Sequence, residues 1–278
     1  MRWPPFEHIF FDCDSTLTSV EGIDVLADIV GKRQRVEVLT QAAMDGTIEL
    51  EEVYAKRLRT LRPTRQQVLD LRHSYKRNMV EDAARVVTAL QALGHKVYII
   101  SGGLAEPVEE FGISLGIPRE RIRAVDIAYN ELSGTWWEKS DVDNKRYMTY
   151  TEGALTISDG KAQIVRELIG DQRGRSLLIG DGNSDLLAGQ AVDLFVGYGG
   201  VVARPKVRDN APVFIESPSL APLLGLAGGP AELRMLSKWS MPYQSLSFKA
   251  NYLIHKGVVR FNDEQLESKF RRAFFSPQ

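Results

Sequence analysis

The chain is poor in several features that mark particular classes of protein. Its 278 residues include one cysteine, so no internal disulfide can form, which excludes a disulfide-stapled scaffold and fits a reducing compartment. No run of about 18 apolar residues is present, and the start, MRWPPFEHIF, lacks the apolar centre of a signal peptide. We therefore expect a cytoplasmic protein without a membrane partner.

An excess of basic charge is also missing. The chain has 35 Lys and Arg against 36 Asp and Glu, a formal net charge of -1, whereas nucleic-acid binding requires a basic surplus. The four histidines share no motif or spacing, which argues against a zinc site or histidine-based catalysis. The composition is that of an ordinary globular protein, and no nucleic-acid partner is expected.

Short apolar runs typical of buried strands recur along the chain, with helix-period segments between several of them. The runs are 8–11, 96–101, 176–180, 194–197 and 213–215, and the helical segments are 82–94, 104–116, 160–170 and 184–191. Because the runs are continuously hydrophobic, they favour strands buried on both faces. This predicts an α/β fold with a Rossmann-like, doubly wound parallel sheet, and a further strand or hairpin near 122–136.

Two segments depart from this rhythm. Residues 22–78 are helix-like and charged with no convincing strand, which predicts a small helical cap inserted after the first strand. The predicted α/β core then consists of residues 1–21 and 79–225. The glycine-rich GLAGGP at 225–230 is interpreted as a linker to a C-terminal extension, residues 226–278.

The extension carries an apolar stripe on a predicted helix, formed by Leu266, Phe270 and Phe274 at four-residue spacing. We expect this stripe to pack on the core or on a second subunit, so a homodimer is one expectation. Contact of this basic, aromatic segment with a membrane or another partner is the alternative.

Polar groups follow three predicted strands at the point where each strand ends. They are Asp12 and Asp14 after the first strand, Ser101 to Gly103 after the second, and Asp181 and Asp185 after a third. The carboxyl ends of neighbouring parallel strands meet at one edge of a sheet, where ligands bind. We therefore expect these groups to face a single crevice.

This set of groups suits phosphoryl chemistry. Clustered carboxylates need a cation, and Mg²⁺ is the usual choice beside substrate phosphate oxygens. A glycine turn that opens a helix can hold an anion, and Lys161, at the start of another helix, offers a fixed positive charge. One carboxylate can then attack phosphorus while another moves a proton.

Each motif alone also has an ordinary structural interpretation. An Asp pair can form a turn or a helix cap, SGG can be a tight turn, and a lysine at a helix start is usually solvated. Cys13, between the two aspartates, is expected to pack in the interior, with redox sensing as the alternative. The ordered appearance of all four motifs beside their expected elements favours the catalytic interpretation.

The order D-C-D-S-T, S-G-G, K and G-D-G-x-x-D resembles the haloacid-dehalogenase-like superfamily of phosphohydrolases, and more narrowly the phosphoserine phosphatase family. The likeness runs from about residue 8 to 225, apart from a divergent, longer segment at about 126–158. Flanking stretches such as DSTLTSVEGIDVLADIVG and FVGYGGVVARPKVRDNA strengthen it.

The resemblance implies the chemistry of the core. Asp12 would be the nucleophile that forms an aspartyl-phosphate, and Asp14 the general acid/base. Ser101 and Gly102 would bind the phosphate, and Lys161 would neutralise charge on the phosphate and the nucleophile. Mg²⁺ would be the cofactor.

The resemblance also implies metal ligands. They are the carboxylates of Asp12 and Asp181 and the backbone carbonyl of Asp14. Asp185 would support these ligands through a water molecule or by contact with the ligands themselves.

In the cap, the resemblance implies substrate contacts. Glu21 matches the family's amine-recognising acid, Arg57 its carboxylate-binding arginine, and Met44 a residue that covers the substrate. A zwitterionic amino acid needs one anion and one cation beyond the phosphate site, and arginine offers the bidentate fork that a carboxylate prefers. From the sequence alone, Arg57 would otherwise lie on a solvated helix face.

Departures from the family concern the pocket lining and its rim. Leu50 and Leu104 stand where the family usually has phenylalanine, and MVEDA (79–83) lacks the usual Pro-Gly. The stretch 136–161 is longer than expected. None of these changes removes a reacting group.

The predicted function is a Mg²⁺-dependent phosphomonoesterase that acts on a small phosphorylated substrate, with phosphoserine as the substrate. The alternatives are a phosphatase or phosphotransferase for another small phosphate monoester, and a catalytically reduced scaffold or binding protein that recruits a partner through its basic tail.

Overall fold

A seven-stranded sheet forms the centre of the computed structural model, which describes residues 3–44, 50–133 and 144–275. Its strand order is β3-β2-β1-β6-β7-β8-β9, with every neighbouring pair parallel except β8 and β9. The strands are β1 (His8–Phe11), β2 (Lys96–Leu104), β3 (Ile122–Val125), β6 (Ser176–Gly180), β7 (Leu194–Tyr198), β8 (Val213–Ile215) and β9 (Val259–Phe261).

Helices cover both faces of the sheet, as the continuous apolar runs predict. On β1, Ile9 and Phe11 pack into one hydrophobic cluster and Phe10 into another. The first cluster includes side chains of α5 (Ala83–Ala92) and α6 (Ala105–Ser114). The second includes side chains of α7 (Lys161–Ile169), α8 (Asn183–Ala188) and α9 (Pro205–Asn210). The predicted doubly wound α/β fold is therefore confirmed.

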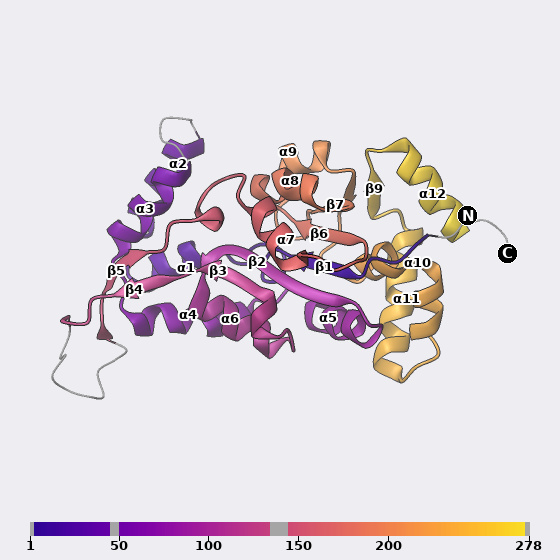
Figure 1. Ribbon diagram of the computed structural model, residues 1–278, viewed down its shortest axis with the longest axis horizontal. Coiled ribbons are helices and arrows are strands. Elements are labelled where there is room, and N and C mark those ends of the chain that lie inside the picture. Colours follow the sequence, from indigo (N-terminus) through magenta and orange to yellow (C-terminus); the bar gives the residue numbers. More distant parts are fainter. Residues whose placement is uncertain (1–2, 45–49, 134–143, 276–278) are drawn as a thin grey trace.

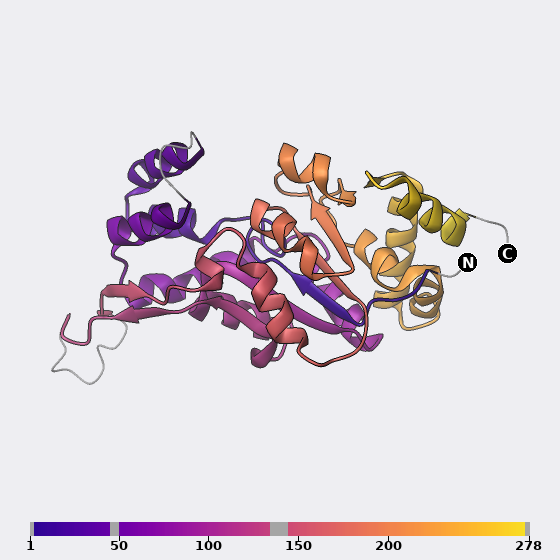
Figure 2. The ribbon, with the colours of Figure 1, turned by 45° about the horizontal axis from the view of Figure 1, so that its top comes forward.

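The segment 22–77, between β1 and β2, is largely helical where it is described. Its helices are α1 (Gly22–Ile29), α2 (Arg33–Met44), α3 (Leu50–Leu61) and α4 (Arg65–Arg77). They have a hydrophobic cluster of their own, which includes Leu26, Leu58 and Leu71. Figure 1 shows these indigo and purple helices at one end of the molecule, and Figure 2 shows the same arrangement after a 45° turn. The helical prediction for the cap is confirmed, while its boundaries as a domain stay a prediction.

The stretch near 122–136 contributes to two sheets. After β3, β4 (Ile127–Tyr129) pairs antiparallel with β5 (Tyr147–Tyr150). Backbone hydrogen bonds join this hairpin to the start of α4, from Tyr147 N to Pro63 O (2.7 Å) and from Arg65 N to Lys145 O (2.9 Å). Because the Tyr147 ring is buried in the cap cluster, the hairpin is packed onto the cap.

The prediction of a linker at 225–230 is wrong, because these residues lie inside α10 (Pro222–Leu236). Gly225 allows close packing: a Cβ there would lie 2.4 Å from Ile254 Cδ1 of α11 (Met241–His255). Gly229, at φ 71°, and Pro230 kink the helix. Its glycines therefore serve close helix packing and a bend.

The rest of the extension also joins the core. The predicted stripe lies on α12 (Glu264–Phe275), where Phe270 is buried and its ring meets Trp3 edge-on at 5.1 Å. The stripe packs on the core, as one of the two expectations had it. Strand β9, which sequence patterning missed, extends the sheet beside β8. No helix within the described residues combines the length and apolarity needed to cross a membrane.

Strand β1 lies in the interior of the sheet, between β2 and β6. On one side of β1 the next strands are β2 and then β3, and on the other side they are β6, β7 and β8, in the order of the chain. Such a reversal opens a crevice beyond the carboxyl ends of the central strands. The predicted carboxylates follow strands that end at this point, while Ser101 and Gly102 lie in the end of β2 itself.

Candidate active site

The loop after β1 carries the two aspartates into a pocket of about 240 Å³. The Asp12 backbone N–H donates to Ile179 O (2.9 Å), which ties the loop to β6. Asp12 and Asp14 both line the pocket, whereas Cys13 between them is fully buried in the core. The packing expected of Cys13 is confirmed, and burial together with Asp14 and Asp12 raises the pKa of its thiol.

Lys161, the first residue of α7, joins two of the carboxylates. Its Nζ lies 2.6 Å from Asp12 Oδ1 and 2.7 Å from Asp185 Oδ1, and its side chain is buried. Burial alone would lower the pKa of Lys161, but the two carboxylates outweigh it and raise that pKa above its ordinary value. The lysine therefore stays charged inside the site.

The glycines of GDGNSD let Asp185 fold back against the end of β6. A Cβ on Gly180 would lie 2.3 Å from the Asp185 carboxyl carbon, so a side chain there would displace the carboxylate. The Gly182 backbone N–H donates to Asp185 Oδ2 (3.1 Å). The spacing G-D-G-x-x-D thus brings Asp181 and Asp185 to the same place.

Three carboxylates are crowded enough to suit a metal ion. Ligand oxygens of Asp12, Asp181 and Asp185 lie within 4.8 Å of one another, and all three residues are buried. Burial and the neighbouring carboxylates raise the pKa of Asp181 to about 7 and that of Asp185 to about 6. An all-oxygen set that repels itself is suited to a hard divalent cation such as Mg²⁺.

The charges that line the pocket lead to the same conclusion. Its described lining has five carboxylates and three cationic side chains, a difference of two negative charges when all are ionised. They are Asp12, Asp14, Glu21, Asp181 and Asp185 against Arg57, Lys161 and Arg204. One divalent cation would balance them, so the residues present fit the metal that the fold family implies.

The second carboxylate of D-x-D has surroundings of its own at the base of the cap. Asp14 Oδ2 accepts a hydrogen bond from the Gly22 N–H (3.2 Å), while its buried Oδ1 has no hydrogen-bond partner among the described residues. Burial, then Glu21 and Asp12, raise the pKa of Asp14 well above its ordinary value. A carboxyl with a raised pKa can carry a proton near neutral pH.

The residues predicted to bind phosphate lie in the last part of β2. The strand continues to Leu104, so Ser101 and Gly102 lie in its irregular end, where the register with β3 shifts, and the turn expected after residue 101 is wrong. Ser101 Oγ accepts a hydrogen bond from the Gly103 N–H (2.9 Å). Both predicted residues still line the pocket beside Asp12.

The cap supplies two of the three predicted substrate contacts. Glu21, just before α1, accepts a hydrogen bond from Ser15 Oγ (2.8 Å), and Arg57 of α3 lines the same pocket. Burial lowers the pKa of Arg57, and the carboxylates of Asp24 and Glu21 oppose that effect. Met44 ends α2, but its side chain lies outside the described part of the structure.

Sequence patterns missed Arg204, at the start of α9. Its guanidinium lies 2.8 Å from Asp181 Oδ2 and 3.1 Å from Glu21 Oε1, so it joins the metal-suited cluster to the cap. The sequence signal for Arg204 was weak, because it consists of an arginine that precedes a proline at the start of a helix. Only the fold shows that the loop after β7 reaches the end of β1.

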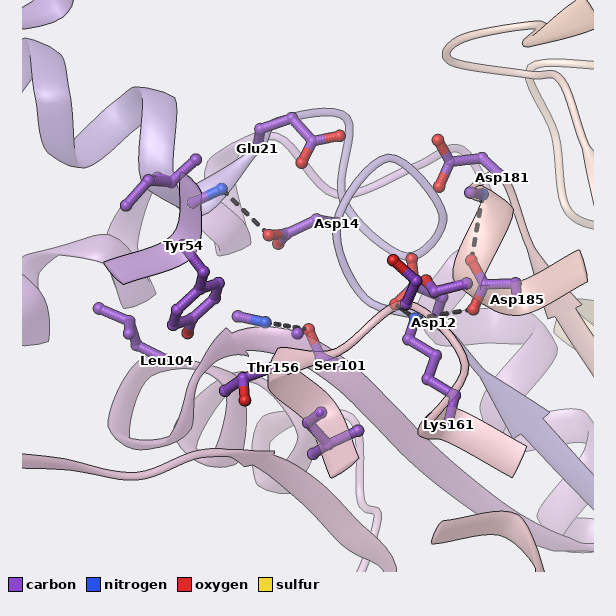
Figure 3. A pocket seen from close by; sticks show the side chains of 18 of the residues that line it. Asp12, Asp14, Glu21, Tyr54, Ser101, Leu104, Thr156, Lys161, Asp181 and Asp185 are labelled. Carbon is purple, nitrogen blue, oxygen red and sulfur yellow. Dashed lines mark hydrogen bonds and ion pairs between the residues drawn. The ribbon is translucent and has the colours of Figure 1, made fainter. Parts of the chain in front are cut away.

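Another wall comes from the longer stretch 136–161, which was expected at the lining or rim of the pocket. Residues 155–158, at and after the short 3₁₀ helix η3 (Ala154–Thr156), line the pocket. The Ser158 backbone N–H donates to Glu51 Oε1 of α3 (3.3 Å), which joins this wall to the cap. Leu104, one of the departures from the family, also lines the pocket. The side chain of Leu50, another departure, is not among those that the structure describes. Figure 3 shows the core carboxylates on one side of the pocket and Tyr54, Leu104 and Thr156 on the other.

Comparisons with known proteins agree with this geometry. Residues 9–190 match the family model of haloacid dehalogenase-like hydrolases. Phosphoserine phosphatases of Drosophila melanogaster and Homo sapiens are each 32% identical over 209 residues, which is 74% of this chain and 73% and 88% of theirs.

A solved phosphoserine phosphatase that holds a phospho-aspartyl intermediate analogue has the same fold. Its TM-score is 0.64 at 23% identity, over 79% of this chain and 98% of that one. The chain therefore belongs to the haloacid dehalogenase-like hydrolase family, in which it is a phosphatase.

Proposed function

We propose that the protein hydrolyses O-phosphoserine to serine and phosphate, with Mg²⁺, through a phosphorylated Asp12. The observation that carries the proposal is the buried contact of Asp12 with Lys161, beside Asp181 and Asp185. The named relatives support the substrate, as do the oppositely charged Glu21 and Arg57 in one pocket. Bound through Asp12, Asp181 and the Asp14 backbone carbonyl, with Asp185 behind them, Mg²⁺ would neutralise phosphate charge.

The first chemical step uses both residues of D-x-D. An Asp12 carboxylate oxygen attacks phosphorus and the bond from phosphorus to the serine oxygen breaks. Asp14 gives its proton to that oxygen, which leaves as the serine hydroxyl; the raised pKa of Asp14 supports this role. Lys161 holds Asp12 in place and neutralises charge on the transferring group.

The second step returns the enzyme to its starting state. Asp14, now a carboxylate, takes a proton from water as the water oxygen attacks phosphorus. The acyl-phosphate bond breaks, and Asp12 is released with inorganic phosphate. Ser101 and Gly102 are proposed to hold the phosphate oxygens in both steps, and Arg57 and Glu21 the carboxylate and the amine of serine. Met44 is proposed to cover the substrate.

Finer assignments belong to the same proposal. Because the proposed product is serine, we place the protein in serine biosynthesis. We also place it in the cytoplasm. The single cysteine, buried and unpaired, supports a reducing compartment. A homodimer, and the division into core, cap and C-terminal extension, stay predictions.

Phosphate release from phosphoserine, phosphothreonine, phosphoethanolamine and sugar phosphates tests the substrate. Phosphoserine should be turned over far faster than the sugar phosphates, and equal rates would contradict the substrate assignment. Asp12→Asn should abolish turnover, because an amide cannot form the intermediate, whereas Asp209→Asn, at an exposed ion pair on α9, should not. Wild-type activity in Asp12→Asn would overturn the nucleophile.

A further inference from the structure

The hydroxyl of Tyr54 in α3 has no hydrogen-bond partner among the described residues, although its oxygen is buried. Buried tyrosine hydroxyls are nearly always hydrogen-bonded, so an exception needs an explanation. Tyr54 also lines the pocket that holds Asp12 and Arg57. The missing partner is therefore expected among the molecules that bind in this pocket.

The position of Tyr54 is fixed by the elements around it. It lies one helical turn before Arg57 on α3, so the two side chains share a face of the helix. Its ring packs edge-on against Tyr150 of β5 at a centroid distance of 5.1 Å. In Figure 3 the ring projects from the cap toward the strand end that carries Ser101.

The chemistry of the hydroxyl is that of a donor. Burial, then electrostatic repulsion from Asp14, raises the pKa of Tyr54, so the hydroxyl keeps its proton at neutral pH. The nearby walls include the apolar side chains of Leu104 and Leu155, which cannot accept its hydrogen bond. An oxygen acceptor on a bound molecule can.

The hydroxyl oxygen of Tyr54 has almost no exposure to solvent, so water competes little for it. Asp14 Oδ1, on the carboxyl proposed to serve the leaving group, is buried in the same way and also has no partner among the described residues. Exclusion of water strengthens a hydrogen bond to an anionic oxygen.

We propose that Tyr54 is a specificity-determining residue whose hydroxyl donates a hydrogen bond to an anionic oxygen of the bound substrate. The inference rests on the proposed function, because phosphoserine offers two such oxygens, on its phosphate and on its carboxylate. The pocket suits both sources, because Ser101, proposed to bind the phosphate, and Arg57, proposed to bind the carboxylate, line it together with Tyr54.

The experiment compares Tyr54→Phe with the matched variant Tyr150→Phe. Each removes one hydroxyl and keeps a ring, but Tyr150 does not appear among the described pocket-lining residues. Tyr54→Phe should raise KM for phosphoserine about tenfold, the effect of losing one hydrogen bond to a charged group, with kcat changed far less. Tyr150→Phe should leave both parameters near wild type.

The two products identify the oxygen. Inhibition constants for inorganic phosphate and for L-serine are measured with Mg²⁺ for the wild type and both variants. Weaker inhibition by phosphate alone places the bond on the phosphate, and weaker inhibition by serine alone places it on the carboxylate. Unchanged KM and inhibition constants in Tyr54→Phe would overturn the inference, as would equal losses in Tyr150→Phe.

Failure of the proposed function has a different signature. If wild-type protein released no phosphate from phosphoserine, the substrate assignment would fall. Calorimetric binding of inorganic phosphate and of L-serine to wild type and Tyr54→Phe would then decide the role of Tyr54: weaker binding of either by the variant supports it, and equal binding of both overturns it.

Discussion

Arg204 Nε lies 2.8 Å from Asp181 Oδ2, which places a fixed positive charge against a carboxylate of the metal-suited cluster. The same guanidinium reaches Glu21 at the edge of the cap. Because a cation at this distance competes with a metal ion for the Asp181 oxygens, Arg204 should set the metal affinity of the site.

Arg204→Gln should bind Mg²⁺ about fivefold more tightly, a change of about 1 kcal/mol, because the site loses one positive charge. Isothermal titration at a pH above 7, where Asp181 is ionised, measures this change. Arg208→Gln, which breaks an exposed pair with Asp209 on the same helix, is the control and should bind Mg²⁺ like wild type. Weaker Mg²⁺ binding by Arg204→Gln would show that Arg204 positions Asp181 instead.

Lys161→Met should lower the free energy of unfolding by about 3–5 kcal/mol, because it leaves two buried carboxylates without their cation. Urea unfolding of the metal-free protein measures the loss. The control is Lys56→Met, which breaks an exposed pair with Glu52 on α3 and should cost about 1 kcal/mol or less. Equal losses in the two variants would contradict the buried pairing.

Stability should depend on pH and Mg²⁺ together. Asp181 and Asp185 have pKa values raised to about 7 and about 6, so the metal-free folded state binds more protons than the unfolded chain from about pH 4 to 7. Their contribution to stability is therefore lost as the pH rises through this window. Mg²⁺ binds the ionised carboxylates, so its stabilising effect should grow over the same range.

Thermal unfolding with and without Mg²⁺ measures this linkage. The rise in melting temperature on adding Mg²⁺ should be larger at about pH 8 than at about pH 5, and smaller in Asp181→Asn at both. Comparing the two metal states at each pH cancels titrating groups outside the site. An equal rise at both pH values would contradict the raised pKa values.

Phe270→Ala should destabilise the protein by about 3–5 kcal/mol, because the ring is only 2% exposed and packs against Trp3. Phe248→Ala on α11 removes the same side chain from a position that is 60% exposed and should change stability by about 0.5 kcal/mol or less. Chemical unfolding compares the two. A mild effect of Phe270→Ala would mean that the extension is dispensable to the core.

Deleting residues 231–278 tests the same segment by removing it. Because α10, α11 and α12 contribute to the main hydrophobic cluster, the shortened chain should unfold at lower urea concentration and expose apolar surface. Size-exclusion chromatography of the full chain, run beside it, addresses the predicted homodimer. A shortened chain as stable as the full one would overturn the packing argument.

The sequence by itself determined the buried strands β1, β2, β6, β7 and β8, and it marked the residues proposed to carry the core chemistry. The continuous apolar run at 8–11 favours a strand covered on both faces, and the acids that follow such a strand lie at its end. Asp12, Asp14, Lys161, Asp181 and Asp185 could be predicted because each lies a few residues from an element with a strong hydrophobic period.

Only the tertiary structure decided which distant loops complete the site. Arg204 and residues 155–158 reach the pocket through contacts made far along the chain, and neither has a local period that marks it. The glycines at 225–229 predict a linker, but glycine is found both in flexible turns and where two helices pack closely, and here they lie in a helix. Tyr54 likewise has no sequence feature that marks it, and it became a candidate because the fold buries its hydroxyl without a partner among the described residues. Local sequence fixes the period of each element, whereas the satisfaction of charges and hydrogen bonds depends on which elements meet.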